Sequence, residues 1–290
     1  MIIVADSALQ LSYETIQSLG IEVVEYPMYL NGEPYSVSIS MSREEKDKLR
    51  LLLKDKDNKV TTSGLREEDL LGIYNKYKGE KIISLHQSGR ASTATAAVIK
   101  KVLSENSELD IIYIDAHHLT AAYSVLVQAA AEAVKEGKSF DEVIELIEKS
   151  RTNTNHLGVV YDLFYLHRTG RIGLAKAILG TAMKIISILG SSDEPGVLKA
   201  IGKVKTSAQA NQRFIKIIKD DVETKSGTRI KGVISVIGPH EKEAEHLKML
   251  TDNLGKEIGT ATDIEIHYTN HSNMPHAGPD FYDIGYIIYG

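Results

Sequence analysis

Short apolar segments alternate with helix-length segments along the first half of the chain, and this alternation constrains the fold most. In order, the segments are 2–4, 12–19, 67–77, 81–85, 92–103, 111–114 and 119–135. Strands that alternate with helices of this length are typical of βαβ units, in which parallel strands are covered by helices. The first half is therefore predicted to be an α/β sandwich with a mainly parallel sheet. Within it, Asn31-Gly32 predicts a hairpin turn, and Ser42 followed by Glu45 predicts a capping box at the start of a helix.

The pattern changes after residues 151–156, a polar stretch without periodicity. Predicted strands beyond it are 158–161, 185–189, 197–201, 231–237, 264–268 and 286–289, and predicted helices are 163–166, 174–179, 208–222 and 241–254. Hairpin-like residues at 191–196 favour a partly antiparallel sheet with helices on one face. We predict an α/β domain at 1–154 and a smaller α+β domain at 155–290, with a ligand bound between the two.

Composition narrows the classes of partner. The chain has 290 residues, a formal net charge of -5 and no cysteine. The acidic balance argues against nucleic acid, because phosphate contacts need clustered Lys and Arg. Disulfides and thiolate metal sites are excluded. The first residues lack a signal-peptide pattern and no apolar run reaches the ~18 residues of a membrane span, so we expect a soluble, cytoplasmic protein.

Hydroxyl-bearing turns follow three strand-like segments of the first half. They are Asp6-Ser7, Thr61-Thr62-Ser63 and the stretch from Ser88 to Ser92. In an open parallel sheet such turns gather at one edge, where ligands bind. Small hydroxyls and free backbone N–H groups suit a carboxylate or a phosphate. The turns therefore predict a site for an anionic small molecule.

The same turns have plain structural interpretations. Ser7 could close a local turn with Asp6, and Thr62 or Ser63 could cap the helix that follows them. Ser92 is a natural N-cap of its own helix. These interpretations do not exclude an anion site, because the N-terminus of a helix attracts negative charge.

An esterase or other serine hydrolase is the alternative function from a different class. The stretch around Ser88 lacks the G-x-S-x-G elbow of many such enzymes. A base would have to come within hydrogen-bond reach of the nucleophile, and His86 or His276 are the candidates. The sequence alone leaves this alternative open.

Two further side chains are candidates for contact with an anionic head group. Arg171 follows the turn Thr169-Gly170 and could supply a countercharge, although a lone arginine is more commonly a surface residue. His276 is expected in a turn before the last strand, as a hydrogen-bond donor or as a solvated loop side chain. The ten histidines show no metal-ligand spacing. We therefore expect no metal and no cofactor.

Taken in order, short motifs along the whole chain resemble those of the DegV family of bacterial lipid-binding proteins. The matching stretches are 3–7, 31–32, 39–45, 62–63, 86–92, 165–172, 202–205 and 276–279. The resemblance implies a two-domain fold that binds a long-chain fatty acid between its domains and is not itself an enzyme. Several members resemble the acyl-carrying subunit of a bacterial fatty acid kinase, whose separate kinase subunit phosphorylates the bound carboxylate.

The resemblance also implies roles for particular residues. Thr62, Ser63 and Ser92 would hold the carboxylate, with Arg171 and His276 near it. The chain departs from the family where Ser92 is followed by Thr-Ala instead of Gly-Thr, and where Ser63 is followed by Gly-Leu instead of Gln-Pro. Candidates for the wall around the fatty acid tail are Leu174, Ala177, Ile178, Leu179, Ala182, Met183, Ile185, Ile186 and Ile188.

Overall fold

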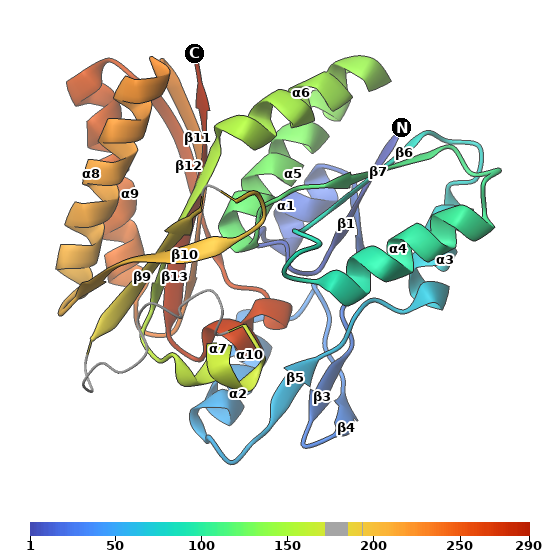
Figure 1. The fold of residues 1–290 in the computed structure, drawn as a ribbon, viewed down its shortest axis with the longest axis horizontal. Coiled ribbons are helices and arrows are strands. Elements are labelled where there is room, and N and C mark those ends of the chain that lie inside the picture. The colour runs from blue at the N-terminus through green and yellow to red at the C-terminus, as the bar shows by residue number, and fades with distance from the viewer. Residues whose placement is uncertain (172–184, 193) are drawn as a thin grey trace.

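A four-stranded parallel sheet forms the core of the first half, in the order β2-β1-β6-β7 (Figure 1). The computed structural model describes residues 1–171, 185–192 and 194–290. The elements of this sheet and its helices are β1 (Ile2–Asp6), α1 (Tyr13–Ser18), β2 (Ile21–Val24), α3 (Glu67–Lys76), β6 (Ile82–His86), α4 (Thr93–Glu105), β7 (Ile111–Asp115), α5 (Thr120–Lys135) and α6 (Phe140–Asn153). The predicted α/β architecture is confirmed.

A small antiparallel sheet stands apart from the parallel one. It consists of β3 (Met28–Leu30), β4 (Glu33–Tyr35) and β5 (Val60–Thr62), with α2 (Arg43–Lys54) between the last two strands. Asn31 and Gly32 form the predicted hairpin turn, both with positive φ, at 56° and 92°. The strand before Thr62 was expected to belong to the parallel sheet, which is wrong. It pairs instead with the strand of this hairpin.

The second half builds a six-stranded sheet in the order β10-β9-β8-β13-β11-β12. Its elements are β8 (Thr154–Val160), α7 (Phe164–Arg168), β9 (Ile186–Ser191), β10 (Leu198–Val204), α8 (Ser207–Lys225), β11 (Arg229–Ile237), α9 (Glu241–Ile258), β12 (Ala261–Tyr268), η2 (His271–Asn273), α10 (Met274–Ala277) and β13 (Phe281–Tyr289). The pairing of β11 with β12 is parallel and the other pairings are antiparallel. This agrees with the predicted mixed sheet.

Helices cover both faces of this second sheet. Helices α8 and α9 lie on its outer face, whereas α5 from the first half packs on the inner face (Figure 1). The contact is close at Gly285 in β13, where an added Cβ would lie 2.1 Å from the backbone nitrogen of Ala122. The expectation of helices on one face therefore holds only for the helices that the second half itself supplies.

One segment of the second half is embedded in the first. The side chain of Asn270 donates to the carbonyls of Leu9 and Leu11, at 2.6 and 3.0 Å, and Asn273 donates to the carbonyl of Ala8 at 2.8 Å. All three asparagine contacts satisfy buried backbone groups that a loop would otherwise leave unpaired. The division into domains at 1–154 and 155–290 stays a prediction. The segment with Asn270 and Asn273 belongs to the second predicted domain but contacts the first.

The polar stretch at 151–156 is not a linker. It contains the last turn of α6 and the first residues of β8, so a helix runs directly into a strand.

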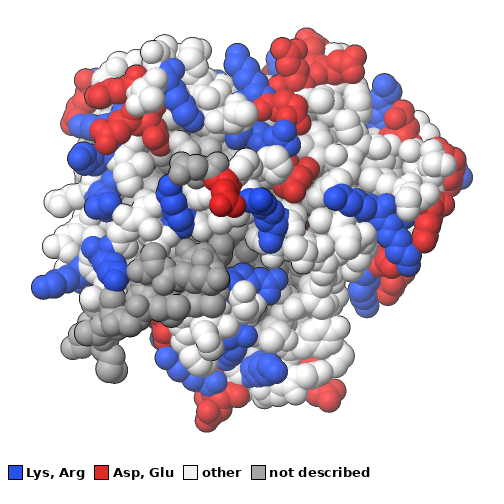
Figure 2. Space-filling model, viewed as in Figure 1, with Lys and Arg blue, Asp and Glu red and all other residues white. Residues whose placement is uncertain are grey.

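The predicted helix at 174–179 and the candidate tail residues Leu174 to Met183 lie outside the described residues. Figure 2 shows blue and red side chains interspersed on the face it presents. In the part of the chain that the structure describes, no helix is long and apolar enough to span a membrane.

Candidate functional site

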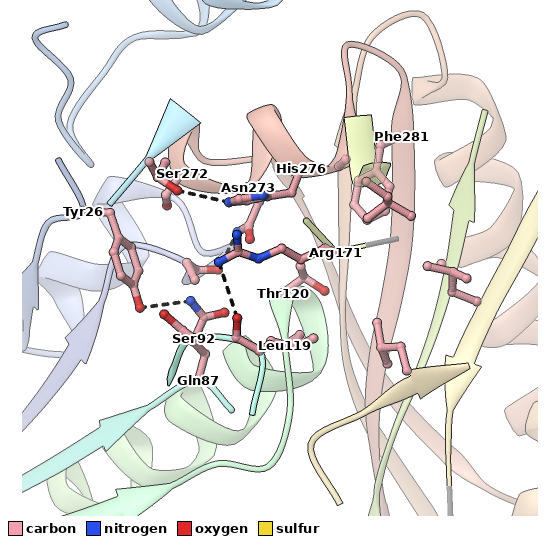
Figure 3. A pocket seen from close by; sticks show the side chains of 18 of the residues that line it. Tyr26, Gln87, Ser92, Leu119, Thr120, Arg171, Ser272, Asn273, His276 and Phe281 are labelled. Carbon is pink, nitrogen blue, oxygen red and sulfur yellow. Dashed lines mark hydrogen bonds between the residues drawn. The ribbon is translucent and has the colours of Figure 1, made fainter. Parts of the chain in front are cut away.

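A cavity of about 290 Å³ lies between the parallel sheet and the six-stranded sheet (Figure 3). Its described lining comprises Ala8, Tyr26, Thr62, Ser63, Gly64, Gln87, Ala91, Ser92, Thr93, Ala94, Leu119, Thr120, His156, Gly158, Val160, Leu166, Arg171, Leu189, Leu198, Ser272, Asn273, His276, Ala277 and Phe281. In Figure 3, Tyr26, Gln87 and Ser92 lie on one side, Phe281 lies on the other and Arg171 lies between them. The cavity therefore has a polar side and an apolar side.

The N-terminus of α4 forms part of the polar side. Ser92 occupies the expected N-cap position, but its hydroxyl donates to Thr95 Oγ1 at 2.9 Å and makes no capping bond to the backbone. The first amide groups of a helix have no carbonyl partner within the helix. The start of this 13-residue helix therefore offers free N–H groups and the positive end of its dipole.

A glycine brings the end of β5 against this helix. A Cβ at Gly64 would lie only 2.9 Å from the Cβ of Ala94. The close approach places Thr62 and Ser63 on the same cavity as Ser92, although Thr62 ends a strand of the small sheet and Ser92 begins a helix of the parallel sheet's layer. Ser63 is exposed, so this part of the lining lies toward solvent.

Tyr26 adds a hydroxyl that the sequence analysis did not identify. The side chain is 4% exposed, and its oxygen accepts hydrogen bonds from Gln87 Nε2 at 2.9 Å and Thr95 Oγ1 at 3.3 Å. Burial raises the pKa of the phenol well above its usual value, so the group keeps its proton. Because both lone pairs are occupied, this proton is free to donate to a ligand.

His276 lies in the short helix α10 and not in the expected turn. Its Nε2 is 3.1 Å from Thr62 Oγ1, and its Nδ1 is buried with no hydrogen-bond partner among the described residues. The ring borders the cavity but is shielded from bulk water. This burial, with the positive charge of Arg171 nearby, lowers its pKa from 6.5 to about 3. His276 is therefore neutral at physiological pH.

Arg171 carries the charge of the site. Its Nη1 donates to the carbonyl of Thr169 at 2.6 Å and its Nη2 lies 3.5 Å from the carbonyl of Ala91. No other permanently charged side chain is found among the lining residues that the structure describes. The guanidinium has no carboxylate partner in that lining, so it remains available to an anion.

The six-stranded sheet and the short helices near it supply the apolar side. Val160, Leu166, Leu189 and Phe281 are all buried and line the cavity from β8, α7, β9 and β13. Of the expected tail residues that the structure describes, Ile188 is buried in the core on the other face of β9. Ile185 and Ile186 are half-buried and are not part of the described lining. The wall thus comes from several strands, not from one apolar stretch.

Asp6 and His86 do not line the cavity, but Asp6 hydrogen-bonds to residues that do. Asp6 is fully buried and accepts from the backbone of Ala8 and Gln87 and from His86 Nδ1, each at 3.1 Å. The turn at Asp6 is therefore a structural feature, as the plain interpretation of this turn stated. His86 Nε2 contacts Ser84 at 2.7 Å, so neither nitrogen of His86 faces Ser92.

The cavity brings together all five predicted site residues: Thr62, Ser63, Ser92, Arg171 and His276. Their binding roles stay predictions. Sequence reasoning missed Tyr26, Gln87 and Asn273, which also line it. Gln87 directly follows β6 at the carboxyl edge of the sheet, a position that favours ligand contact and could have been used. Across the described ranges there is no group of three or more His, Asp or Glu side chains placed to hold a metal ion.

Comparison with known proteins decides the family. The sequence model of a family described as "Uncharacterised protein, DegV family" matches residues 1–288. The chain belongs to the DegV family. A DegV domain-containing protein of Halalkalibacterium halodurans is 27% identical over 271 residues, which cover 89% of this chain and 93% of the relative.

Solved DegV structures share the fold. A fatty-acid-binding DegV family protein from Thermus thermophilus superimposes with a TM-score of 0.85 at 22% identity, covering 99% of both chains. A protein from Eubacterium ventriosum, described as binding stearic acid, gives a TM-score of 0.81 at 18% identity and covers 99% of this chain and 98% of its own. The arrangement of the two large sheets is thus the arrangement of DegV proteins.

The low pKa of His276 makes the stability of this DegV chain depend on pH. The unfolded chain takes up a proton on this histidine near pH 6.5, whereas the folded protein takes it up only near pH 3. Between these values the unfolded state binds more protons, so the free energy of unfolding falls as the pH is lowered. In lipid-free protein, the free energy of unfolding should fall between pH 7 and pH 5. We expect this fall to be about 1–2 kcal/mol smaller in His276→Gln than in the wild type. Urea unfolding at both pH values measures it. Equal losses in the variant and the wild type would contradict a buried, neutral His276.

Proposed function

We propose that this DegV protein binds a long-chain fatty acid in the cavity between its two large sheets. The observation that carries the proposal is the division of the lining. Neutral hydroxyls and the start of α4 lie on one side, with Arg171 beside them, and buried aliphatic and aromatic side chains lie on the other. A fatty acid has the same division into a carboxylate and an apolar tail. Fatty acid binding by two structural neighbours adds support.

The polar side can compensate the cost of removing a carboxylate from water. An unpaired buried charge is very unfavourable, whereas charge-assisted hydrogen bonds from an arginine and from hydroxyls are among the strong ones. The donors are Arg171, Tyr26, Thr62 and the first amides of α4. Ser92 would join them by turning its hydroxyl away from Thr95.

The contact between His276 and Thr62 sets the direction of one hydroxyl. With the proton of the neutral imidazole on Nε2, His276 donates to Thr62 Oγ1. The hydroxyl proton of Thr62 is then free to point to the carboxylate. A neutral histidine thus acts through the threonine and adds no charge of its own.

The tail supplies most of the affinity. Each methylene group that leaves water contributes ~0.8 kcal/mol before ordering costs. The residues beside the polar donors include the exposed Ser63, Thr93 and Ala94, whereas Val160 and Phe281 on the apolar side are buried. We therefore place the carboxylate near the mouth and the tail inside.

This placement suits a protein that presents a carboxylate to a partner. Phosphorylation by a separate fatty acid kinase subunit remains a prediction from the resemblance. The esterase alternative finds no support in the geometry, because the hydroxyl of Ser92 donates to Thr95 and the nearby His276 contacts Thr62. The proposed role is binding and presentation of the fatty acid in the cytoplasm.

The first test is the ligand itself. Organic extraction and mass spectrometry of protein purified without added lipid should yield a long-chain fatty acid in near-equimolar amount. Lipid-free protein should bind stearic acid more tightly than its methyl ester, because the ester loses the charge-assisted hydrogen bonds. Calorimetric titration with both ligands measures the difference. Equal affinities would show that the head group is not recognised.

Removal of single hydroxyls tests the polar side. We expect Thr62→Val and Ser92→Ala each to weaken stearic acid binding by about 1–2 kcal/mol, roughly 5- to 30-fold, since each removes one donor to a buried carboxylate. Ser104→Ala, on the far end of α4, is the matched control and should leave binding unchanged. Wild-type affinity in both cavity variants would remove these residues from the site.

A further inference from the structure

The cavity contains a second polar position, at His156. His156 in β8 is 2% exposed and lines the cavity beside Thr120. Its Nε2 lies 2.7 Å from Asp283 Oδ2 and 2.9 Å from Thr120 Oγ1. Its Nδ1 is buried and finds no hydrogen-bond partner in the part of the chain that the structure describes. A buried polar atom left in this way costs stability unless a ligand or water satisfies it.

Gly158 lies beside this histidine on the face of β8 that lines the cavity. Alternate residues of a strand point to the same face, and His156, Gly158 and Val160 all line the cavity. A Cβ at position 158 would lie 3.6 Å from His156 Cε1, the atom bonded to Nδ1, and 3.6 Å from Phe281 Cε2. With Asp283 Cβ at 3.4 Å, these are ordinary contact distances, so the methyl group of an alanine would fit there. Glycine inside a strand weakens it and often marks the close approach of another group.

The local charge indicates what kind of group approaches. The buried carboxylate of Asp283 already accepts from Thr120, His156 and the backbone of Ala121 at the start of α5. A second carboxylate beside it would be repelled, whereas Arg171 attracts one elsewhere in the cavity. A neutral group is therefore favoured at His156.

A hydroxyl satisfies Nδ1 in either protonation state of the ring. Nε2 faces the carboxylate of Asp283 and carries a proton. Nδ1 is then an acceptor in the neutral ring and a donor in the protonated ring. A hydroxyl can both donate and accept, and it fits between apolar neighbours on a chain of methylene groups.

We propose that the cavity recognises a hydroxylated long-chain fatty acid, whose chain hydroxyl binds His156 Nδ1 over Gly158. The inference rests on the proposed function, because it assigns a second contact to the same ligand. It makes His156 and Gly158 determinants of specificity, while Arg171 and the hydroxyls of the polar side hold the carboxylate.

The test compares stearic acid with a series of hydroxystearic acids that differ only in the position of the hydroxyl. Each displaces a fluorescent fatty acid from the lipid-free, full-length protein. We expect one isomer, or two adjacent ones, to bind about 5- to 10-fold more tightly than stearic acid, the gain from one net hydrogen bond. His156→Phe should abolish this preference, so that the favoured isomer and stearic acid bind the variant with equal affinity. His246→Phe, at an exposed position on α9, is the matched control and should keep the preference.

Each outcome decides between the inference and the function on which it rests. If stearic acid binds and no isomer binds better, the inference falls, Nδ1 is satisfied by water and the proposed function stands. If neither class of acid binds, both fall. A preference that persists in His156→Phe overturns the inference. Should that variant fail to fold, Gly158→Ala takes its place, since the added methyl group covers the ring edge. Loss of the preference in Gly158→Ala supports the inference, and an unchanged preference overturns it.

Discussion

Arg171→Ala should weaken stearic acid binding by about 2–4 kcal/mol, roughly 30- to 1000-fold. Among the described residues that line the cavity, Arg171 is the one with a permanent charge. Its loss leaves the carboxylate with neutral donors only. The affinity of Arg171→Lys for stearic acid should lie between those of Arg171→Ala and the wild type. Lysine keeps the charge but loses the bidentate geometry of the guanidinium.

The methyl ester separates the charge of Arg171 from the shape of the cavity. The ester carries no charge, so its affinity should change little in Arg171→Ala, and the two ligands should bind the variant almost equally. Calorimetric titration of both ligands against both proteins measures the coupling between carboxylate and guanidinium. Arg66→Ala, which removes an exposed arginine paired with Asp69, is the control and should bind as the wild type does.

Two results of this experiment would contradict the site. If the variant binds stearic acid as tightly as the wild type does, the carboxylate lies elsewhere. If the ester loses as much affinity as the acid, Arg171 shapes the cavity and does not pair with the ligand. Thermal unfolding of each variant without ligand shows whether a loss of binding reflects a loss of fold.

Features set by neighbouring residues could be predicted from the sequence. Ser42 and Glu45 form the expected capping box, with hydrogen bonds in both directions. Asn31 and Gly32 make the expected hairpin turn, because both tolerate positive φ. The parallel sheet followed from the alternation of strands and helices, since that connection leaves few other arrangements.

Features set by distant pairing could not be predicted in the same way. The sequence of residues 60–62 is compatible with a strand of the parallel sheet and with a strand added to a hairpin. Its partner is determined by the edge of β3, with which it pairs in the structure. His276 lies in a four-residue helix that ends at Gly278, and such a helix is stable only through tertiary packing. The sequence suggested a turn there.

The candidate site shows the same limit. Its hydroxyl turns were visible in the sequence, because each follows a strand-like segment. Tyr26, Asn273 and His156 were not, since each becomes a lining residue only when the segment after β2, the helix η2 and the strand β8 meet around one cavity. Chemistry carried by local motifs was therefore identified, and chemistry assembled from distant strands was missed.

Asp283→Ala should lower the free energy of unfolding by about 3–5 kcal/mol, the range for removing one partner of a buried charged network. Asp283 is fully buried in β13. It accepts from Thr120 Oγ1 at 2.5 Å, His156 Nε2 at 2.7 Å and the backbone of Ala121 at 3.2 Å, and also from Ser235 Oγ. The partners come from α5 and from two strands of the six-stranded sheet, so the carboxylate joins the first half of the chain to the second.

An isosteric replacement should be nearly as harmful, which distinguishes this network from simple packing. The partners of Asp283 act as donors, so the side-chain amide of Asp283→Asn must turn an N–H toward at least one of them. We expect a loss of about 2–4 kcal/mol from the donors left unpaired. Asp220→Ala, at an exposed position on α8, should stay within about 0.5 kcal/mol of the wild type. Chemical denaturation of lipid-free protein measures all three. A loss below about 1 kcal/mol in both Asp283 variants would mean that α5 and the second sheet are held together by apolar packing instead, since that is all that one ordinary hydrogen bond contributes.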